Sequence, residues 1–344
     1  MAKTSEGRAI AALRSDEFEQ ALSENLRALQ QASERPTRAG GPRIRCIGET
    51  HGSHFLNASS ATLGGTGALL LELPGSYGTD VLLDPGWGTL VAARRSDIHL
   101  DDVGIVLVSH AHLDHTGDLA AVLLWLGLNG IRPSLVANTT TLFGAKGQPP
   151  VLSQFFLDKC DHFAIAESGQ LSGFESLHLR SFFTKHRETA VINGQSLAFV
   201  VDLLVGDAGR VGLVTDGPLN LEDRSFISAL RECTTLIVNL GTMSLSPGSP
   251  FHNHTFDNAL CLSGLEDLLK SMAAEPCELR RLAVTHLGAE VLEPISDPMR
   301  RFLAEYAASS PIDLLAPALT GLVRQELGSD VETVVLREGD AMEL

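Results

Sequence analysis

The sequence predicts an α/β protein with a large buried core, and two observations carry this prediction. First, short apolar segments typical of buried strands recur along most of the chain, with helical patterns between them. Second, several of these segments end directly in a histidine or an aspartate. With 344 residues, of which 44% are hydrophobic, the chain is long enough for one large domain or two smaller ones.

The charge and the cysteine content indicate in which cellular compartment the protein works and which partners it can bind. The chain has 42 acidic and 26 basic residues and a net charge of −16, which repels phosphate backbones and argues against long nucleic acids as partners. Five scattered cysteines without a C-x-x-C pair indicate neither a disulfide framework nor a thiolate zinc site. No apolar run is long enough to span a bilayer, and the N-terminus lacks the apolar core of a signal peptide. We therefore expect a cytoplasmic protein that acts on a small molecule and does not bind membranes.

The sequence predicts that the N-terminal region is separate from the main domain. Apolar residues at helical spacing over residues 1–33 indicate an amphipathic helix or helix pair, which would cap the core or form a contact in a homo-oligomer. Proline and glycine in residues 35–42 then interrupt any helix. The sequence thus predicts a helical extension and linker over residues 1–42 and a main domain over residues 43–344.

The strongest local pattern lies at a predicted strand-to-helix turn. A buried strand over residues 103–108 and a buried helix over residues 119–126 flank a polar cluster. Its members are His110, His112, Asp114 and His115. Imidazole and carboxylate groups are ligands that zinc, manganese and iron accept, and a turn can aim them at two points. His110 and His112 would serve one metal, and Asp114 and His115 another. The alternative is a solvated loop rich in histidine.

Three later strands also deliver polar groups at their ends. The strand over residues 171–186 contains His178, expected as a plain strand residue, and ends at His186, the better third imidazole for the first metal. Asp216 directly follows an apolar run, and it is the natural bridging carboxylate because two cations about 3.5–4 Å apart need an anion between them. A further strand ends in His286.

The remaining elements follow in order. Strands and turns fill residues 44–88, and Asp84 is either an outer group that hydrogen-bonds metal-binding histidines or a plain turn aspartate. Further along, the patterns predict a strand and turn at 135–144, a helix at 151–163, a hairpin from 195–205 and 210–219, a strand at 234–242, helices at 256–272 and 299–308, an ambiguous segment at 313–327 and a terminal strand at 330–339.

Histidines in two loops are candidates for substrate contact. His51 lies between early strands, where loops often reach over a site, although such histidines are more often plain polar loop residues. His252 and His254 belong to an H-x-H-T motif before the helix predicted at 256–272, and the alternative is a pair of loop histidines without a ligand.

The motif HAHLDH at residues 110–115 resembles the H-x-H-x-D-H signature of the metallo-β-lactamase superfamily, and the other motif positions occur in the order of that superfamily. The resemblance covers residues 43–344 and implies an αβ/βα four-layer sandwich of two halves. It implies that Asp84 matches an aspartate after an early strand and that His286 is the last ligand. Thr-Asp-Gly at 215–217 is similar to the Gly-Asp motif, with threonine in place of glycine. An imidazole at His112 resembles the hydrolases rather than the flavodiiron branch.

His254 with Thr255 is similar to a motif of phosphodiesterase branches, among them ribonuclease Z, whose histidine is taken to protonate the leaving oxygen. Leu319-Thr320-Gly321 departs from the Asp-Gly of ribonuclease Z-like members. The resulting site places His110, His112 and His186 on one metal, and Asp114, His115 and His286 on the other, with Asp216 bridging. Two divalent ions are expected, zinc first, with manganese or iron as alternatives.

Three functions follow as hypotheses. The first is a dinuclear metal hydrolase that cleaves a phosphodiester in a small nucleotide, with Asp114 orienting a bridging hydroxide and His254 donating the proton. The second keeps the metal centre and cleaves a lactone, a thioester or an amide. The third is a non-catalytic module that binds a metal or a partner.

Overall fold

The structure is a computed structural model. It describes residues 20, 23–24, 40–50, 65–73, 75, 79–145, 149–186, 196–204, 209–241, 260–287, 297–328 and 330–344. The chain divides into two units, Met1–Gly40 and Gly41–Leu344. In the first unit Gln20 and Glu24 are helical, and Gln20 Nε2 donates a hydrogen bond to Glu24 Oε1 at 2.9 Å. The helical extension and linker over residues 1–42 otherwise lie outside the described residues and stay a prediction.

The described part of the second unit contains a first sheet of seven strands in the order β16-β1-β4-β5-β6-β7-β8. Neighbours are antiparallel from β16 to β5 and parallel from β5 to β8. In chain order the strands are β1 (Arg43–Cys46), β4 (Leu69–Glu72), β5 (Asp80–Leu83), β6 (Val103–Val108), β7 (Ser134–Ala137), β8 (His162–Ile165) and β16 (Ala341–Glu343).

A second sheet of seven strands repeats this pattern in the order β9-β10-β11-β12-β13-β14-β15. Neighbours are antiparallel from β9 to β12 and parallel from β12 to β15. The strands are β9 (Leu171–Gly173), β10 (Leu177–Phe183), β11 (Leu197–Leu203), β12 (Arg210–Val214), β13 (Thr235–Asn239), β14 (Arg281–Thr285) and β15 (Glu332–Val335). A short parallel pair, β2 (Gly48–Thr50) and β3 (Gly65–Thr66), forms a separate two-stranded sheet.

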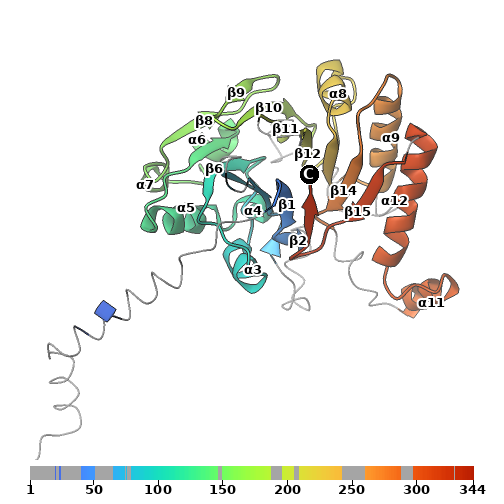
Figure 1. The fold of residues 1–344 in the computed structure, drawn as a ribbon, viewed down its shortest axis with the longest axis horizontal. Coiled ribbons are helices and arrows are strands. Elements are labelled where there is room, and N and C mark those ends of the chain that lie inside the picture. The colour runs from blue at the N-terminus through green and yellow to red at the C-terminus, as the bar shows by residue number, and fades with distance from the viewer. Residues whose placement is uncertain are drawn as a thin grey trace, which may run out of the picture. The chain divides into compact units, whose positions relative to one another are not determined.

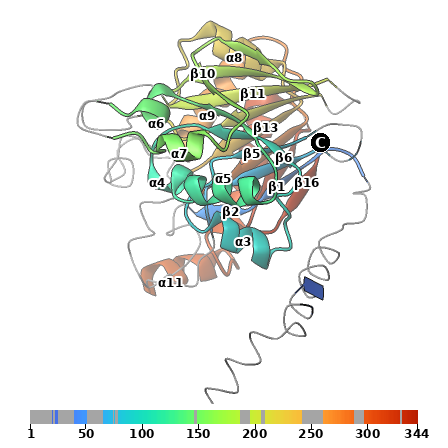
Figure 2. The ribbon, with the colours of Figure 1, turned by 90° about the vertical axis from the view of Figure 1, so that its left-hand side faces the viewer.

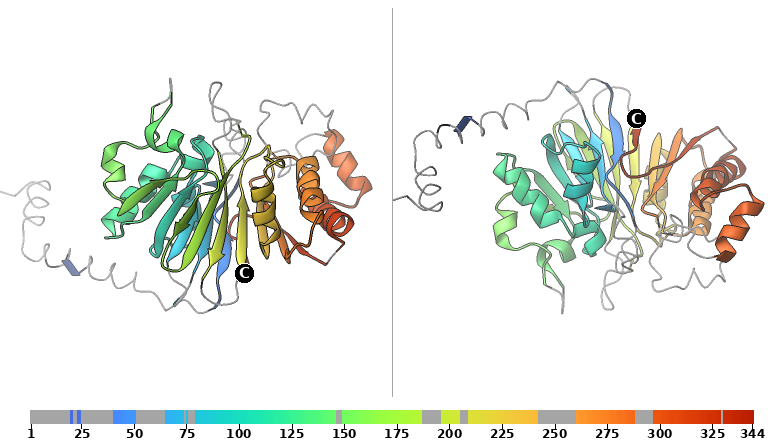
Figure 3. Two further views of the ribbon diagram at one scale, coloured as in Figure 1. Left: turned by 90° about the horizontal axis from the view of Figure 1, so that it is seen from above. Right: turned by 90° about the horizontal axis from the view of Figure 1, so that it is seen from below.

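Helices cover the outer face of each sheet, as the views in Figure 1 and Figure 3 show. The first sheet carries α3 (Thr89–Arg95), α5 (Leu119–Leu128), α6 (Thr139–Phe143) and α7 (Gln154–Leu157), and Figure 2 shows α5 in front of its strands. The second sheet carries α8 (Arg224–Arg231), α9 (Leu262–Ala273) and α12 (Ile312–Leu327). Two further helices are α4 (Leu113–Thr116) and α11 (Asp297–Glu305). These layers confirm the predicted four-layer αβ/βα sandwich.

Strand β6 shows why the buried strands have continuous apolar runs. Ile105 and Leu107 face the core between the two sheets, whereas Val106 and Val108 face the helices. Because successive side chains point to opposite faces, a strand covered on both sides needs apolar residues at every position. Burying each such side chain contributes about 1.5–3 kcal/mol.

Four segments differ from the prediction. The single strand predicted at 171–186 is the antiparallel pair β9 and β10. The helix predicted at 151–163 is wrong for most of its length: α7 spans only Gln154–Leu157, and β8 begins at His162 because it pairs with β7, so tertiary pairing overrides the local pattern. The turn predicted before residue 144 is helix α6, which the Asn138 side chain caps by accepting the Thr141 N–H at 2.9 Å. The ambiguous segment at 313–327 is helix α12 with Pro317 inside it.

The topology brings the ends of five strands to one place. In the second sheet β10 and β12 are both antiparallel to β11, so they run in the same direction as each other and as β14. In the first sheet β5 and β6 are parallel neighbours. The two sheets are joined there by the Leu197 N–H, which donates to Ser109 O at 3.0 Å. Within the described residues, no helix has the length and apolar character needed to span a bilayer.

Candidate metal centre

Three imidazoles from both halves of the sandwich converge on one point. His112 Nδ1 lies 3.0 Å from His110 Nε2 and 3.2 Å from His186 Nε2. Ligand atoms 2.0–2.1 Å from a tetrahedral zinc lie about 3.3 Å from one another, so these nitrogens are spaced like three corners of such a site. His110 and His186 are buried and His112 is half-buried. The structure therefore brings together the three residues predicted for the first metal.

A second group forms beside the first. Asp114 Oδ2 lies 3.5 Å from both His115 Nε2 and His286 Nε2, again close to the edge of a metal coordination shell. Both imidazoles are fully buried, and the side chain of Asp114 is 12% exposed. In each of the two groups the ligand atoms all lie within 4.8 Å of one another. These three residues are those predicted for the second metal.

Asp216 lies between the two groups. Its Oδ2 is 3.3 Å from His115 Nε2, and with His110 and His115 it forms a third set whose ligand atoms lie within 4.8 Å. Its Oδ1 accepts hydrogen bonds from Asn239 Nδ2 at 3.2 Å and from His286 Nδ1 at 3.0 Å. The carboxylate predicted to bridge the metals thus contacts both imidazoles of the second group and lies within 4.8 Å of the ligand atom of His110 in the first.

The backbone between His110 and His115 explains how one short motif supplies both groups. His110 and His112 are two residues apart in the short segment between β6 and α4, and His112 itself has extended backbone. At His112 the chain turns into helix α4, and the His115 N–H donates to His112 O at 3.0 Å. This single turn aims Asp114 and His115 at the second group.

Asp84 holds one imidazole in each group. Its Oδ1 accepts the Ser109 N–H at 2.7 Å, and its Oδ2 accepts from Ser109 Oγ at 2.7 Å and from His115 Nδ1 at 2.8 Å. Because the Ser109 hydroxyl donates to Asp84, its oxygen accepts from His110 Nδ1 at 2.9 Å. Both rings therefore keep a proton on Nδ1 and present Nε2 to the centre, the arrangement that outer carboxylates impose on metal ligands.

Strained and crowded backbone surrounds the centre. Asp84 and His286 have φ angles of 50° and 59°, a region that side chains other than glycine rarely adopt and that clusters at functional sites. A Cβ on Gly86 would lie 1.8 Å from Asp114 O, and a Cβ on Gly67 would lie 2.9 Å from the same atom. Only glycine lets these segments pass so close to the motif.

The charged groups of the centre support one another. Burial alone disfavours the charged form of His115, but Asp114, Asp216 and Asp84 together outweigh it and raise the pKa of His115 well above its usual value. Burial likewise acts against ionisation of Asp216, but the imidazoles of His286 and His115 hold its pKa well below the usual value. The Asp216 carboxylate is therefore ionised and requires positive charge beside it.

The first group has the opposite electrostatic character. Burial, followed by the neighbouring imidazoles of His115 and His186, lowers the pKa of His110 well below its usual value. Burial and His186 also lower the pKa of His112. Neutral imidazole is the form that binds metals, so this group is ready to accept a cation. Across both groups, a nitrogen-rich donor set with two carboxylates fits divalent metal ions.

Sequence reasoning missed four residues that build the centre: Gly67, Gly86, Ser109 and Asn239. Asp-Pro-Gly after a strand was the signal for Gly86, and an asparagine ending a buried strand was the signal for Asn239. His178 lies within β10, as expected of a strand residue. The candidate substrate residues His51, His252 and His254 lie outside the described residues.

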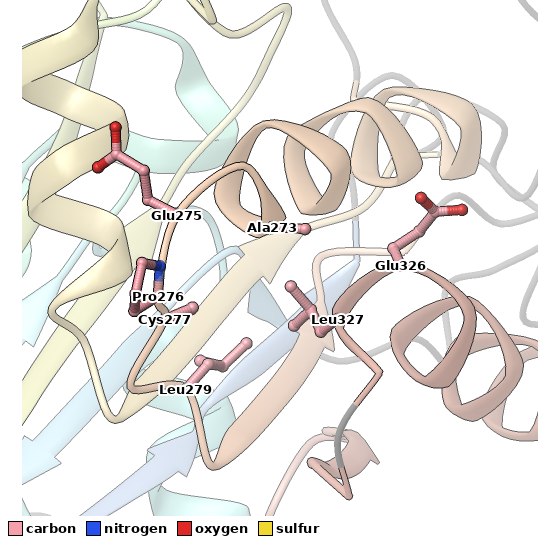
Figure 4. Close-up of a pocket in the computed structure, with 7 residues that line it drawn as sticks. All are labelled: Ala273, Glu275, Pro276, Cys277, Leu279, Glu326 and Leu327. Atoms are coloured by element: carbon pink, nitrogen blue, oxygen red, sulfur yellow. The ribbon is translucent and has the colours of Figure 1, made fainter.

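A surface cavity of about 300 Å³ lies away from these groups, between the ends of α9 and α12 (Figure 4). Its lining contains Glu275, Cys277, Leu279 and Glu326 but no imidazole. The Glu275 carboxylate is paired with Arg231 Nη1 at 2.7 Å. The cavity therefore adds nothing to the metal groups.

Comparison with known proteins agrees with the fold and the motif. Residues 63–190 match the family model of the metallo-beta-lactamase superfamily. Over 117 residues the chain is 27% identical to ribonuclease Z of Agathobacter rectalis, and the match covers 32% of this chain and 36% of that protein. The matched segment thus spans about a third of that relative's length.

Solved structures with low sequence identity share the fold. Unliganded yeast PDE1 gives a TM-score of 0.56 at 12% identity, covering 89% of this chain and 100% of that chain. The short form of human tRNase Z gives 0.54 at 14% identity, covering 87% and 98%. CmlA, a diiron β-hydroxylase from Streptomyces venezuelae, gives 0.53 at 10% identity, covering 89% and 55%.

The superfamily fold implies divalent metal ions, and the histidine and aspartate groups described above lie where strands of both sheets end. Residues 63–190 thus match the metallo-beta-lactamase superfamily, and 117 residues of the chain are similar to a ribonuclease Z.

Proposed function

We propose that this protein is a hydrolase that uses two divalent metal ions to cleave a phosphodiester bond in a small substrate such as a nucleotide. The observation that carries the proposal is the pair of three-residue groups, His110, His112 and His186 beside Asp114, His115 and His286. Three protein ligands on each ion leave coordination positions for water and substrate, as hydrolytic sites require. Asp216 would bridge the ions because its carboxylate forms a third set of ligand atoms within 4.8 Å with His110 of the first group and His115 of the second.

Zinc is the first choice of metal. Five imidazoles and two carboxylates form a borderline donor set, and the spacing of the first group suits a tetrahedral ion. Manganese and iron accept the same ligands, and the structural neighbour CmlA is a diiron protein. Elemental analysis of the protein as purified separates these choices.

Bound cations would act as Lewis acids and lower the pKa of a water molecule to near neutrality. The chain's own residues complete the chemistry. Asp114 is ionised, since His115 and His286 outweigh the effect of burial and hold its pKa well below the usual value. Its side chain is partly exposed, so it can orient the attacking water toward the substrate. His254 would protonate the leaving oxygen, a step typically worth about two to four powers of ten in rate.

Two observations favour a small phosphodiester over other substrates. The matched relative is a ribonuclease Z, whose name states action on RNA, and the His254-Thr255 motif is similar to that branch. The net charge of −16 opposes binding of a long polyanion and leaves a small substrate as the better fit. All five cysteines are free, which fits a cytoplasmic protein.

The test is hydrolysis by metal-reconstituted protein of bis(p-nitrophenyl) phosphate and cyclic nucleotides, in parallel with a lactone, a thioester and an amide. We expect turnover of the phosphodiesters only, and a loss of about 100-fold or more in kcat for His254→Ala. His178→Ala is the matched control, because His178 lies in a strand outside the metal groups. Turnover confined to the acyl substrates would overturn the phosphodiester assignment, and full activity of His254→Ala would remove its role as proton donor.

A further inference from the structure

The backbone at His286 needs support from outside its own strand. His286 follows the last residue of β14 and adopts a φ of 59°, which costs on the order of 1–3 kcal/mol for a residue with a side chain. The next residue, Leu287, donates its N–H to Glu49 O at 2.6 Å. This hydrogen bond fixes the chain immediately after the strained residue. The position of the His286 ring therefore depends on the position of Glu49.

Glu49 is itself held by its carboxylate. Its oxygens accept from Arg337 Nε, from Arg337 Nη2 at 3.1 Å and from the Glu338 N–H at 3.1 Å. Glu49 is only 7% exposed, so its charge is satisfied mainly by these donors. Two parallel N–H···O contacts from a guanidinium also fix the direction of the carboxylate. Glu49 thus has its carbonyl on the segment after His286 and its carboxylate on Arg337.

The turn that carries Arg337 is itself held by hydrogen bonds. The Arg337 N–H donates to Asp340 Oδ2 at 2.8 Å, and the turn exchanges two backbone hydrogen bonds with Cys46: Gly339 N to Cys46 O at 2.8 Å and Cys46 N to Asp340 O at 3.0 Å. Cys46 Sγ also lies 3.3 Å from Thr285 Oγ1, next to His286. The anchor therefore joins β1, β14 and the turn between β15 and β16.

From these contacts we propose that Glu49 and Arg337 are positioning residues for the second metal, which act by holding His286 in its strained conformation. The proposal rests on the metal centre of the proposed function. Neither residue belongs to the groups of ligand-forming side chains, and neither is a catalytic residue. Outer residues of this kind typically change metal affinity by about 10- to 100-fold.

A purely stabilising role predicts something different. The side chain of Arg337 is 45% exposed, and exposed ion pairs contribute little to folding. A structural contribution would also lower the affinity for both metals alike, or for neither. The positioning role instead weakens one metal and spares the other, because His286 belongs only to the second group.

The experiment is stepwise titration of metal-free protein with Zn²⁺ and with Co²⁺ by calorimetry, with metal counting after dialysis. For Arg337→Ala we expect the second metal to bind at least tenfold more weakly and the first within twofold of the wild type. Arg337→Lys, which keeps the charge but not the paired contacts, should restore part of the loss. In a His286→Ala background, Arg337→Ala should change the remaining metal by less than twofold.

Arg281→Ala is the matched control. Arg281 Nε donates to Glu332 Oε2 at 3.1 Å and links β14 to β15 at the end of the strand away from His286. The substitution Arg281→Ala removes an arginine ion pair between β14 and β15 and should leave the affinities for the first and the second metal unchanged. If Arg337→Ala does not fold, Glu49→Gln supplies the same test, because it keeps the shape and the backbone carbonyl of Glu49.

Equal loss of both metals, no loss of the second, or the same loss in Arg281→Ala would overturn the positioning role. The readout is independent of catalysis. A wild-type chain that binds two metals but hydrolyses no substrate refutes the proposed function and leaves this test intact. A wild-type chain that binds fewer than two metals overturns both.

Discussion

The Asp84 carboxylate accepts a hydrogen bond from His115 Nδ1 at 2.8 Å, and through the Ser109 hydroxyl the same oxygen reaches the ring of His110. His115 belongs to one group of ligand-forming side chains and His110 to the other. A single buried carboxylate therefore sets the ring orientation in both halves of the centre. The backbone of Asp84 is itself strained, with a φ of 50°.

Asp84→Asn should weaken both metals together, by about 10- to 100-fold each. The carboxylate accepts at both oxygens, whereas the amide has one acceptor oxygen and turns its NH2 group toward either the Ser109 N–H or the donors Ser109 Oγ and His115 Nδ1, so the contacts that fix both rings are disturbed. Calorimetric metal titration measures the effect. Asp80→Asn is the control, because Asp80 is equally buried but accepts the Leu73 N–H at the other end of β5. Loss of one metal alone would contradict the shared role of Asp84.

Gly86→Ala should destabilise the protein and abolish stoichiometric metal binding. The added Cβ would lie 1.8 Å from Asp114 O, a contact that only a backbone shift can relieve. We expect a loss of about 2–4 kcal/mol, measured by denaturant unfolding. Gly321→Ala in α12 meets nothing within 4 Å and should stabilise the protein by about 0.5–1 kcal/mol. Wild-type metal content in Gly86→Ala would contradict the close packing.

Asn239→Leu should lower kcat about tenfold with metal content unchanged, because Asn239 Nδ2 fixes the Asp216 carboxylate between the groups at 3.2 Å. Steady-state kinetics on bis(p-nitrophenyl) phosphate and elemental analysis provide the measurement. Thr235→Val, at the other end of β13, removes a buried hydroxyl that makes no hydrogen bond within the described residues and should be neutral. A wild-type kcat in Asn239→Leu would show that Asp216 needs no such support.

The stability of the metal-free protein should depend on pH in both directions around the ordinary histidine pKa of about 6.5. The folded-state pKa of His115 is raised, chiefly by Asp114 and Asp216 against the effect of burial, so its contribution is present below about pH 6.5 and is lost as pH rises toward the folded value. The folded-state pKa of His110 is lowered by burial, so its contribution is present above about pH 6.5 and is lost as pH falls.

Metal binding should shift this balance in one direction. Cations displace the protons held by His115 and His286, whose pKa is also raised against burial by Asp216, so the increase in Tm on adding Zn²⁺ should grow from pH 6 to pH 8. Thermal unfolding with and without metal across this range gives the comparison. An increase in Tm that is the same at every pH would show that the metal displaces no protons.

Particular residues show how much of the metal centre could be predicted from the sequence. A ligand at the end of a buried strand can be recognised in the sequence, because it directly follows an apolar run. On this basis His110, His186 and Asp216 could be proposed as neighbours. His178 and His186 could be told apart because one lies inside a strand and the other beyond its end. The grouping into the same two sets follows from the geometry.

Other features required the folded chain. The close approach of Gly67 and Gly86 to Asp114 joins segments that no local pattern connects. The first two residues of strand β8 were predicted as the end of a helix, because the exposed residues of this strand carry no alternation and only pairing with β7 makes it a strand. The Glu49–Arg337 pair joins residues at opposite ends of the domain.

Each group of ligands draws on both sheets: His110 and His112 follow β6 of the first sheet and His186 follows β10 of the second, while His286 completes the other group from β14. A cation at either point is therefore a cross-link between the two halves, next to the Ser109–Leu197 hydrogen bond that already joins them. The unfolded chain cannot offer these ligands together. Free metal in the cell would accordingly stabilise the folded protein, and its contribution to the free energy of unfolding grows as RT ln(1 + [metal]/Kd).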